Sequence, residues 1–505
     1  MNNRDTGLTT FHKSIITALG LGFFSSAFSA SWMCTDVDNW NNSACWSGSV
    51  IPGESAAVNI EAASGSHVTV NYNDSTNPPV RLGDFYLNAA EGGTATLIRN
   101  DNYALNSSYF FLGEDGTGVS SVIHNSGSSQ FGTGSIGKNG GANGYYELNG
   151  TGNLRWQRLE LGLGGSGVFV QSGGTHTIDA GGLSVGAWGA GSGHYTLQGG
   201  TLNVNGLENV GHANRGVFTQ NGGTHNVRRL YIGRWGNGLF EMNDGALNVA
   251  EWLEIGTTES GNGSFVQNGG RVNIAGSTAI SATGIAAGSY QLNGGTLQTA
   301  YVDNNDRFEH SGGLLIGDVV NQDQLLFSGT GTRQVQGSVT NTGETVFQPW
   351  FGGERRTRTA HSSITLSEGT ALHITENLQL DDLGSFTIEL GGDSFGLDNF
   401  VQVDGIATLG GILELELFSD FIAQDGDRWT LFSASHINGL FSEALLNESF
   451  VDLDFSLAYT GTTVDLIATS VAPVPVPAAV WLFGSGLVGI LTLSRRGRKT
   501  APATS

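Results

Sequence analysis

The sequence predicts an all-β protein, a β-solenoid (right-handed β-helix) with coils of about 22–26 residues, and two observations indicate this fold. A template of alternating apolar and polar residues recurs along the centre of the chain, with copies starting at Gly167, Gly193, Gly216, Gly238, Gly263 and Gly288. Alternation is typical of strands with one buried face, and a period of 20–50 residues is typical of solenoids. Glycine supplies 78 of the 505 residues, and its Gly-Gly pairs allow bends between strands. A propeller is the alternative, but its blades need about 40–50 residues.

The inward positions of the template predict the core. One column is aromatic in every copy: Phe169, Tyr195, Phe218, Phe240, Phe265 and Tyr290. An aromatic residue at one repeat position is typical of stacking in the interior rather than of a cofactor site. Two neighbouring inward columns mix apolar residues with Gln or His. Because buried polar groups need partners, we expect the Gln and His of one coil, such as Gln171 and His176, to hydrogen-bond each other.

Residues 1–29 have the pattern of a secretory signal peptide. Basic residues precede an apolar stretch at 15–28, and Ala27 and Ser29 are small residues at the two positions that signal peptidase reads. The alternative is a membrane helix that stays in place. The short apolar stretch and the polar residues after it favour the signal peptide.

Residues 30–84 are predicted to form an N-terminal cap. Cys34 and Cys45 lie close together there, and in an oxidising compartment we expect them to form a disulfide. Two cysteines without clustered histidines do not make a zinc site. The segment, with Asp38-Asn-Trp40 and Cys45-Trp-Ser-Gly48, resembles the module that precedes the β-helical passengers of autotransporter-like surface proteins.

The coils are predicted to occupy residues 85–345 and a C-terminal β-domain residues 346–470. An end of a β-helix is an open sheet edge, which a cap must cover. Glycine becomes less frequent toward the C-terminus while alternating strands such as residues 412–417 continue. Residues 399–417 resemble the closing segment of autotransporter-type passengers. The C-terminal domain is therefore predicted to cap the solenoid.

Residues 471–499 have three parts: a proline motif, an apolar run predicted as a membrane helix at 478–494, and a basic cluster. The motif is Val474, Pro475, Val476 and Pro477, and the cluster includes Arg495, Arg496 and Arg498. The basic cluster predicts that residues 500–505 form a cytoplasmic tail. This layout resembles the PEP-CTERM sorting signal of exosortase substrates, with Val476 where the family pattern has Glu.

The resemblance implies a route for the protein. The chain would be exported across the inner membrane, anchored there transiently by its C-terminal helix, and then moved to the cell surface or the extracellular space. Its partners on this route would be signal peptidase and an exosortase-type processing enzyme. The net charge of −23 disfavours nucleic acid as a partner.

One outward column suggests a binding surface. It carries Glu160, Glu208 and Glu254, and the turns beside it carry Trp188 and Trp235, two coils or about 9.6 Å apart. Carboxylates with exposed aromatic rings commonly contact sugars, so these five residues are candidates for glycan binding. The alternative is a solvated charged face whose tryptophans pack over neighbouring coils.

No pattern in the sequence predicts catalytic, cofactor-binding or metal-binding residues. A Gly-x-Gly-x-x-Gly match at 162–167 lies within the repeat, and no helix is predicted after it to hold phosphate. The predicted function is that of a surface-sorted, non-catalytic structural protein or adhesin of the extracellular matrix or biofilm. The alternative is a β-helix protein that binds an extracellular polysaccharide or cleaves it, as a polysaccharide lyase or glycoside hydrolase does.

Overall fold

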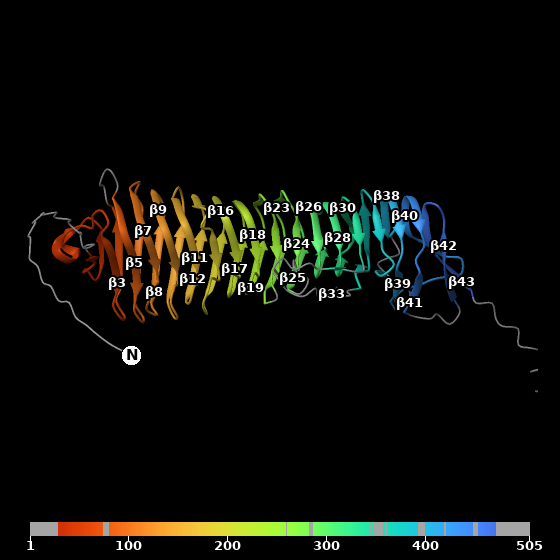
Figure 1. Ribbon diagram of the computed structural model, residues 1–505, viewed down its shortest axis with the longest axis horizontal. Coiled ribbons are helices and arrows are strands. Elements are labelled where there is room, and N and C mark those ends of the chain that lie inside the picture. The colour runs from red at the N-terminus through yellow and green to blue at the C-terminus, as the bar shows by residue number, and fades with distance from the viewer. Residues whose placement is uncertain are drawn as a thin grey trace, which may run out of the picture. The chain divides into compact units, whose positions relative to one another are not determined.

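The described residues fold as an all-β β-solenoid of about 14 turns with almost no helix, which confirms the predicted β-solenoid. The computed structural model (Figure 1) describes residues 29–73, 80–258, 260–281, 286–342, 345–346, 357–358, 361–391, 399–418, 421–447 and 453–470. These residues form two compact units: the first ends at Thr219 and also includes Gly223–Asn226, and the second includes Gln220–Gly222 and the residues from Val227 onward. The described residues include two short 3-10 helices, η1 (Ser43–Cys45) and η2 (Ser47–Ser49).

In the first unit, each coil contributes strands to two parallel sheets, and each strand pairs with the one a coil away (Figure 1). The short-strand sheet contains β2 (Val37–Asn39), β4 (His67–Tyr72), β6 (Thr94–Arg99), β8 (Val119–His124), β10 (Asn143–Leu148), β12 (Ser166–Gln171) and β15 (Ser192–Leu197). The long-strand sheet contains β1 (Ser29–Ser31), β3 (Ala57–Ala62), β5 (Arg81–Ala89), β7 (Ala104–Leu112), β9 (Ser128–Ile136), β11 (Asn153–Leu161), β13 (Thr175–Ile178), β14 (Leu183–Val185) and β16 (Thr201–Val210). The boundary between the units falls in β17 (Arg215–Gln220) and β18 (Thr224–Ile232).

The second unit likewise has a short-strand sheet and a long-strand sheet, both parallel. Its short-strand sheet contains β19 (Asn237–Met242), β22 (Asn262–Gln267), β25 (Ala287–Leu292), β27 (Arg307–His310), β29 (Gln324–Phe327), β34 (Ser363–Leu366), β37 (Ser385–Leu390), β39 (Ile412–Leu417) and β41 (Glu443–Leu446). Its long-strand sheet contains β20 (Ala246–Val249), β21 (Leu253–Ile255), β23 (Arg271–Ile274), β24 (Thr278–Ile280), β26 (Thr296–Asn304), β28 (Leu314–Asn321), β30 (Gly331–Gln336), β31 (Val339–Asn341), β35 (Thr370–Ile374), β36 (Leu378–Leu380), β38 (Val401–Leu409) and β40 (Arg428–Gly439).

The solenoid continues beyond residue 345, where the sequence predicted a separate β-domain. Gln324 of β29 pairs in parallel with Ser363 of β34, and Ser363 pairs with Ser385 of β37. The lower glycine content there does not change the fold, because a parallel ladder needs only alternating strands in register. Between these coils, β32 (Thr345–Val346) and β33 (Thr357–Arg358) form a small antiparallel pair.

Antiparallel strands close the C-terminal end of the long-strand sheet. The last parallel strand, β40, pairs with β43 (Thr463–Ser470), and β43 pairs with β42 (Leu453–Tyr459). Such strands cover an edge that would otherwise offer unpaired backbone groups to another chain. A cap is therefore present, as a two-strand extension of the solenoid.

The predicted aromatic column lies in the core. Phe169 stacks on Tyr146 at 5.0 Å and on Tyr195 at 4.8 Å between ring centroids, and Tyr195 stacks on Phe218 at 4.9 Å. In the second unit, Phe265 stacks on its neighbours in the same way. These separations match the spacing of about 4.8 Å between paired strands, so one ring per coil fills the column without gaps.

A second repeated motif, seen as Leu159-Glu-Leu-Gly162 and Leu183-Ser-Val-Gly186, ends in glycine for a local reason. Gly162 follows β11 with a φ of 66°, in the left-handed region that residues with a Cβ seldom adopt. A Cβ there would also collide with the backbone carbonyl of Ser192 in the next coil. Gly186 has the same conformation one coil later, where the colliding group would be Arg215. The repeat therefore requires glycine at this corner.

The buried glutamine and histidine of one coil are bridged rather than directly bonded, so the expected direct pair is wrong. The Tyr195 hydroxyl donates to Gln171 Oε1 at 2.6 Å and lies 2.9 Å from His176 Nδ1. Gln171 Nε2 donates to the Thr201 carbonyl at 3.0 Å. Burial lowers the pKa of His176 to about 3, so the ring is neutral and its Nδ1–H can donate to the tyrosine oxygen.

The same arrangement recurs at two other places in the core, where a buried His or Gln is followed, one coil later, by Tyr. His124 Nδ1 lies 3.0 Å from the Tyr146 hydroxyl, and the Tyr290 hydroxyl donates to Gln267 Oε1 at 2.6 Å. The hydroxyl supplies the hydrogen bond that a buried polar group requires.

Candidate functional site

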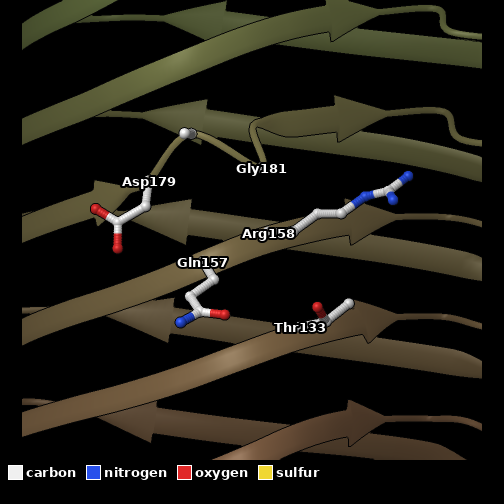
Figure 2. A pocket seen from close by; sticks show the side chains of 6 residues that line it. Thr133, Gln157, Arg158, Asp179 and Gly181 are labelled. Carbon is white, nitrogen blue, oxygen red and sulfur yellow. The ribbon is translucent and has the colours of Figure 1, made fainter.

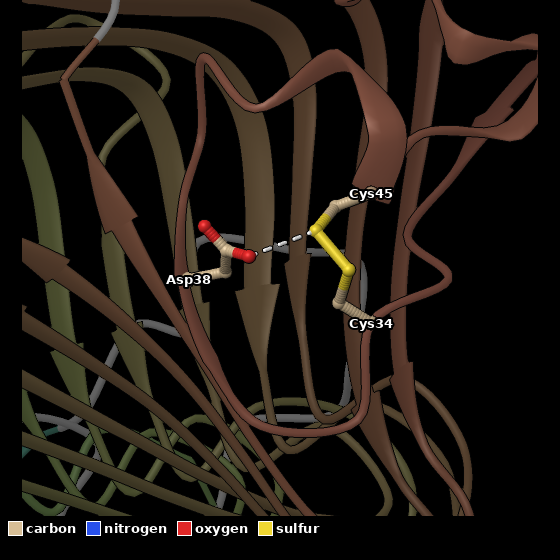
Figure 3. Close-up of side chains that lie close together, drawn as sticks. All are labelled: Cys34, Asp38 and Cys45. Carbon is tan, nitrogen blue, oxygen red and sulfur yellow. Dashed lines mark hydrogen bonds between the residues drawn. A yellow bond between two sulfur atoms is a disulfide. The ribbon is translucent and has the colours of Figure 1, made fainter.

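The predicted disulfide is present in the N-terminal module. Cys34 and Cys45 are bonded, with their Cα atoms 5.1 Å apart (Figure 3). Asp38 Oδ2 lies 3.2 Å from Cys45 Sγ and accepts a hydrogen bond from Asn42 Nδ2 at 2.9 Å. A disulfide sulfur has no hydrogen to donate and is not a thiolate ligand, so Cys34, Asp38 and Cys45 hold no metal while the bond is intact.

Tryptophans of the same module form the start of the core. Trp40 and Trp46 are buried with ring centroids 4.7 Å apart, and Trp46 Nε1 donates to the Trp40 carbonyl at 2.7 Å. Trp40 also stacks on Phe85 of the first long coil at 6.1 Å. These rings pack at the start of the core, and β3 and β4 of residues 30–84 already pair in parallel with the coils that follow.

Glu208 points into the core, so the prediction that it faces solvent is wrong. In the register of β14 and β16, Glu208 lies opposite the inward Leu183, while Asn209 lies opposite Ser184. The segment Leu207-Glu-Asn-Val-Gly211 has one residue more than Leu183-Ser-Val-Gly186, which moves the carboxylate from the outer to the inner face. There Glu208 Oε2 lies 2.7 Å from His225 Nε2, with both side chains fully buried.

The other two predicted carboxylates lie on strands as expected but are partly covered. Glu160 of β11 accepts a hydrogen bond from Arg158 at 2.6 Å. Glu254 of β21 is half-buried, and its pKa is raised by desolvation, against the opposing effect of Arg234 and Arg229. Neither is a freely solvated carboxylate.

The two predicted tryptophans differ in exposure. Trp188 is 51% exposed after β14, with its ring edge-to-face with His212 at 4.8 Å. Trp235 is half-buried, and the Arg234 guanidinium lies 4.2 Å from the centre of its ring. The residues belong to different units, so the expected spacing between the rings stays a prediction.

A shallow groove of about 360 Å³ lies on the long-strand sheet of the first unit (Figure 2). Thr133 of β9, Gln157 and Arg158 of β11, and the turn Asp179–Gly181 line it. In Figure 2, Arg158 and Asp179 extend to opposite sides of Gln157. Its polar lining consists of a hydroxyl, an amide, a guanidinium and a carboxylate, which together can both donate and accept hydrogen bonds.

Two residues that line the groove, Thr133 and Arg158, belong to a column of outward residues that extends to earlier coils. The register places Asp84, Tyr109, Thr133 and Arg158 opposite one another on β5, β7, β9 and β11. Tyr109 is 47% exposed, and its ring lies beside that of Phe111 at 6.2 Å. The sequence did not predict this surface, because the template is weak in these upstream coils.

Aromatic side chains pack against one another beside the column that contains Tyr109. Phe111 stacks on Tyr86 at 5.2 Å, and Lys138 Nζ lies 4.2 Å from the centre of the Phe111 ring. The Tyr86 hydroxyl donates to Asp84 Oδ2 at 3.1 Å. Burial and the Asp84 carboxylate raise the pKa of Tyr86 to about 12, so this hydroxyl remains protonated at neutral pH.

Basic side chains on and beside the groove are paired with carboxylates. The pairs are Arg155 with Asp179, Arg158 with Glu160 and Lys138 with Glu114. Arg155 binds Asp179 through two nitrogens, at 2.9 and 3.0 Å. The surface therefore has charged groups but little local excess of positive charge.

The residues of the predicted sorting signal, from Val474 to Arg498, and the membrane helix at 478–494 lie outside the described residues, as does most of the signal peptide. Within the part of the chain that the structure describes, no helix has the length and hydrophobicity that a membrane span requires. The location of the protein stays a prediction.

Comparisons with protein families, curated proteins and solved structures find no match to this chain.

Proposed function

We propose that the protein is a secreted, surface-sorted β-helix with a structural or adhesive role in the extracellular matrix or biofilm, and that it acts without catalysis. The observation that supports this most is the use of surface polar groups to join successive coils. Asn149 donates to Asn125 at 3.0 Å, and the ladder Asn243, Asn268 and Asn293 has bonds of 2.8 and 2.9 Å. A surface whose side chains bond coil to coil resists separation of the coils, as an extended matrix component must.

Export across the inner membrane is part of the proposal. It rests on the signal peptide and on the C-terminal sorting motif with its arginines. The disulfide between Cys34 and Cys45 supports it, because structural disulfides persist mainly in oxidising compartments. On this route, signal peptidase, an exosortase-type enzyme and, transiently, the inner membrane would be the partners.

Deletion of the gene in the native host tests the function. We expect a weaker matrix and poorer retention of cells within it, restored by the full chain. Replacement of Arg495, Arg496 and Arg498 by Ala should leave the protein synthesised but reduce its delivery to the surface. A normal matrix after deletion, or a restored matrix with the protein confined to the cytoplasm, would contradict the proposal.

Polysaccharide binding is a second candidate, which the groove on the first unit favours. Polysaccharide cleavage has less support from the same residues. A glycosidase needs a general acid whose carboxyl is held protonated by apolar surroundings. Both oxygens of Asp179 accept hydrogen bonds from Arg155, and Glu160 accepts one from Arg158. Arginine hydrogen bonds thus engage both carboxylates, an arrangement that suits binding better than acid catalysis.

A further inference from the structure

We propose that the groove and the Tyr109 column bind a neutral polysaccharide that runs along the stacking direction of the coils. One sugar ring would lie against Tyr109, and hydroxyls of the following units would bond to Thr133, Gln157, Arg158 and Asp179. The inference deepens the adhesive function proposed above by naming a surface and a class of ligand.

The composition of the surface indicates a sugar. An exposed tyrosine ring offers an apolar face to the C–H face of a pyranose. The groove beside it offers a hydroxyl, an amide and a paired guanidinium and carboxylate, which match the donors and acceptors of sugar hydroxyls. A volume of about 360 Å³ is within the range of small-molecule sites, which begins at about 300 Å³.

The charges indicate that the polysaccharide is neutral. Arg155 and Arg158 are both paired with carboxylates, so an anionic sugar would have to displace Asp179 or Glu160. The whole chain has a net charge of −23, which repels polyanions at longer range. Hydroxyl groups can share these ion pairs without displacing them.

The register sets the direction of the bound chain. Tyr109, Thr133 and Arg158 occupy one column on three successive coils. With about 4.8 Å between coils, Tyr109 and Arg158 are about 9.6 Å apart along the stacking direction. A linear polysaccharide along the column therefore meets a new side chain at each coil, whereas a chain across it would leave the groove after one.

Small residues keep the groove open. Gly132 lies on β9 between Phe131 and Thr133, and Gly181 lines the groove in the turn one coil beyond Gln157. A Cβ on Gly132 would collide with the Ser108 carbonyl, and one on Gly181 with the Gln157 carbonyl. Backbone packing thus requires glycine at both sites, and at Gly181 this leaves the lining of the groove without a side chain.

Affinity electrophoresis of the purified full chain tests the proposal. Gels would contain dextran, galactomannan or xyloglucan as neutral probes and alginate as an anionic probe. We expect retardation by at least one neutral polysaccharide and none by alginate. Tyr109→Ala should weaken retardation about tenfold, as loss of a central aromatic contact commonly does, and Gln157→Ala should also weaken it. Both side chains are exposed, so the melting temperature should not change.

Tyr301→Ala is the matched control. Tyr301 is 43% exposed, similar to Tyr109, but it lies on β26 of the second unit and does not line the groove. The Tyr301→Ala variant should be retarded by the polysaccharide as strongly as the wild-type chain is. Equal retardation of the Tyr109→Ala variant and the wild type, retardation by alginate alone, or no retardation by any probe would overturn the inference. If gene deletion causes a matrix defect and any of these results is also obtained, the proposed structural function is retained. Only the proposed polysaccharide-binding surface is then contradicted.

Discussion

Substitutions of the buried pair Glu208 and His225 test the register between β14 and β16. Their side chains are fully buried, and Glu208 Oε2 lies 2.7 Å from His225 Nε2. Glu208 occupies a position that is Leu183 one coil earlier, and the repeat aligns His225 with Leu202. Leucine at both sites would therefore continue apolar columns that already exist.

The single substitutions should lower the free energy of unfolding, whereas the double substitution should leave it unchanged or raise it. His225→Leu leaves a buried carboxylate without its partner and should cost about 3–5 kcal/mol in the free energy of unfolding. Glu208→Leu removes the acceptor of a buried histidine and should cost about 1–3 kcal/mol. The double variant removes both polar groups at similar volume, so it should be between neutral and about 4 kcal/mol more stable than the wild type.

Hydrogen exchange of the β16 amides is the suitable assay, because long repeat arrays need not unfold in one step. Urea denaturation of the full chain gives a second measure. The control is the surface pair of Arg155 and Asp179, whose coupling should be only about 0.2–1 kcal/mol. Additive effects of Glu208→Leu and His225→Leu, with a double variant less stable than either single variant, would refute the buried pairing and the register behind it.

Three further outcomes are expected. Tyr195→Phe removes the hydroxyl that bridges Gln171 and His176 and should cost about 1–3 kcal/mol by urea denaturation; an unchanged midpoint would contradict the bridge. Burial lowers the pKa of His176 to about 3 and that of His310 to about 4, below the usual 6.5, so the unfolded chain binds more protons between these values. Stability should be full above pH 6.5 and fall below it, by up to about 1.4 kcal/mol per pH unit for each histidine, and denaturation at pH 7, 5 and 4 would measure it. Cys34→Ser opens a short disulfide loop and should lower stability by about 3 kcal/mol, and the same loss on reduction of the wild-type chain is the check.

Local pattern was enough to predict much of this fold. Alternation identifies inward residues because successive side chains of a strand face opposite ways, and Phe169 and Tyr195 lie in the core as expected. The close spacing of Cys34 and Cys45 likewise predicted their disulfide. The bridge between Gln171 and His176 was not predicted, because it depends on the hydroxyl of Tyr195 in the next coil.

The features that the sequence did not predict depend on how strands of different coils pair. One extra residue before Glu208 was visible in the sequence, but only its register with Leu183 shows that the carboxylate turns inward. Tyr109 and Arg158 are 49 positions apart in a region of weak repeats, and they share a column only because β7, β9 and β11 pair strand by strand. Alternation fixes the faces of a single strand, whereas the hydrogen bonds of a parallel ladder fix which residues of different coils are neighbours, and surfaces that span coils therefore depend on the tertiary structure.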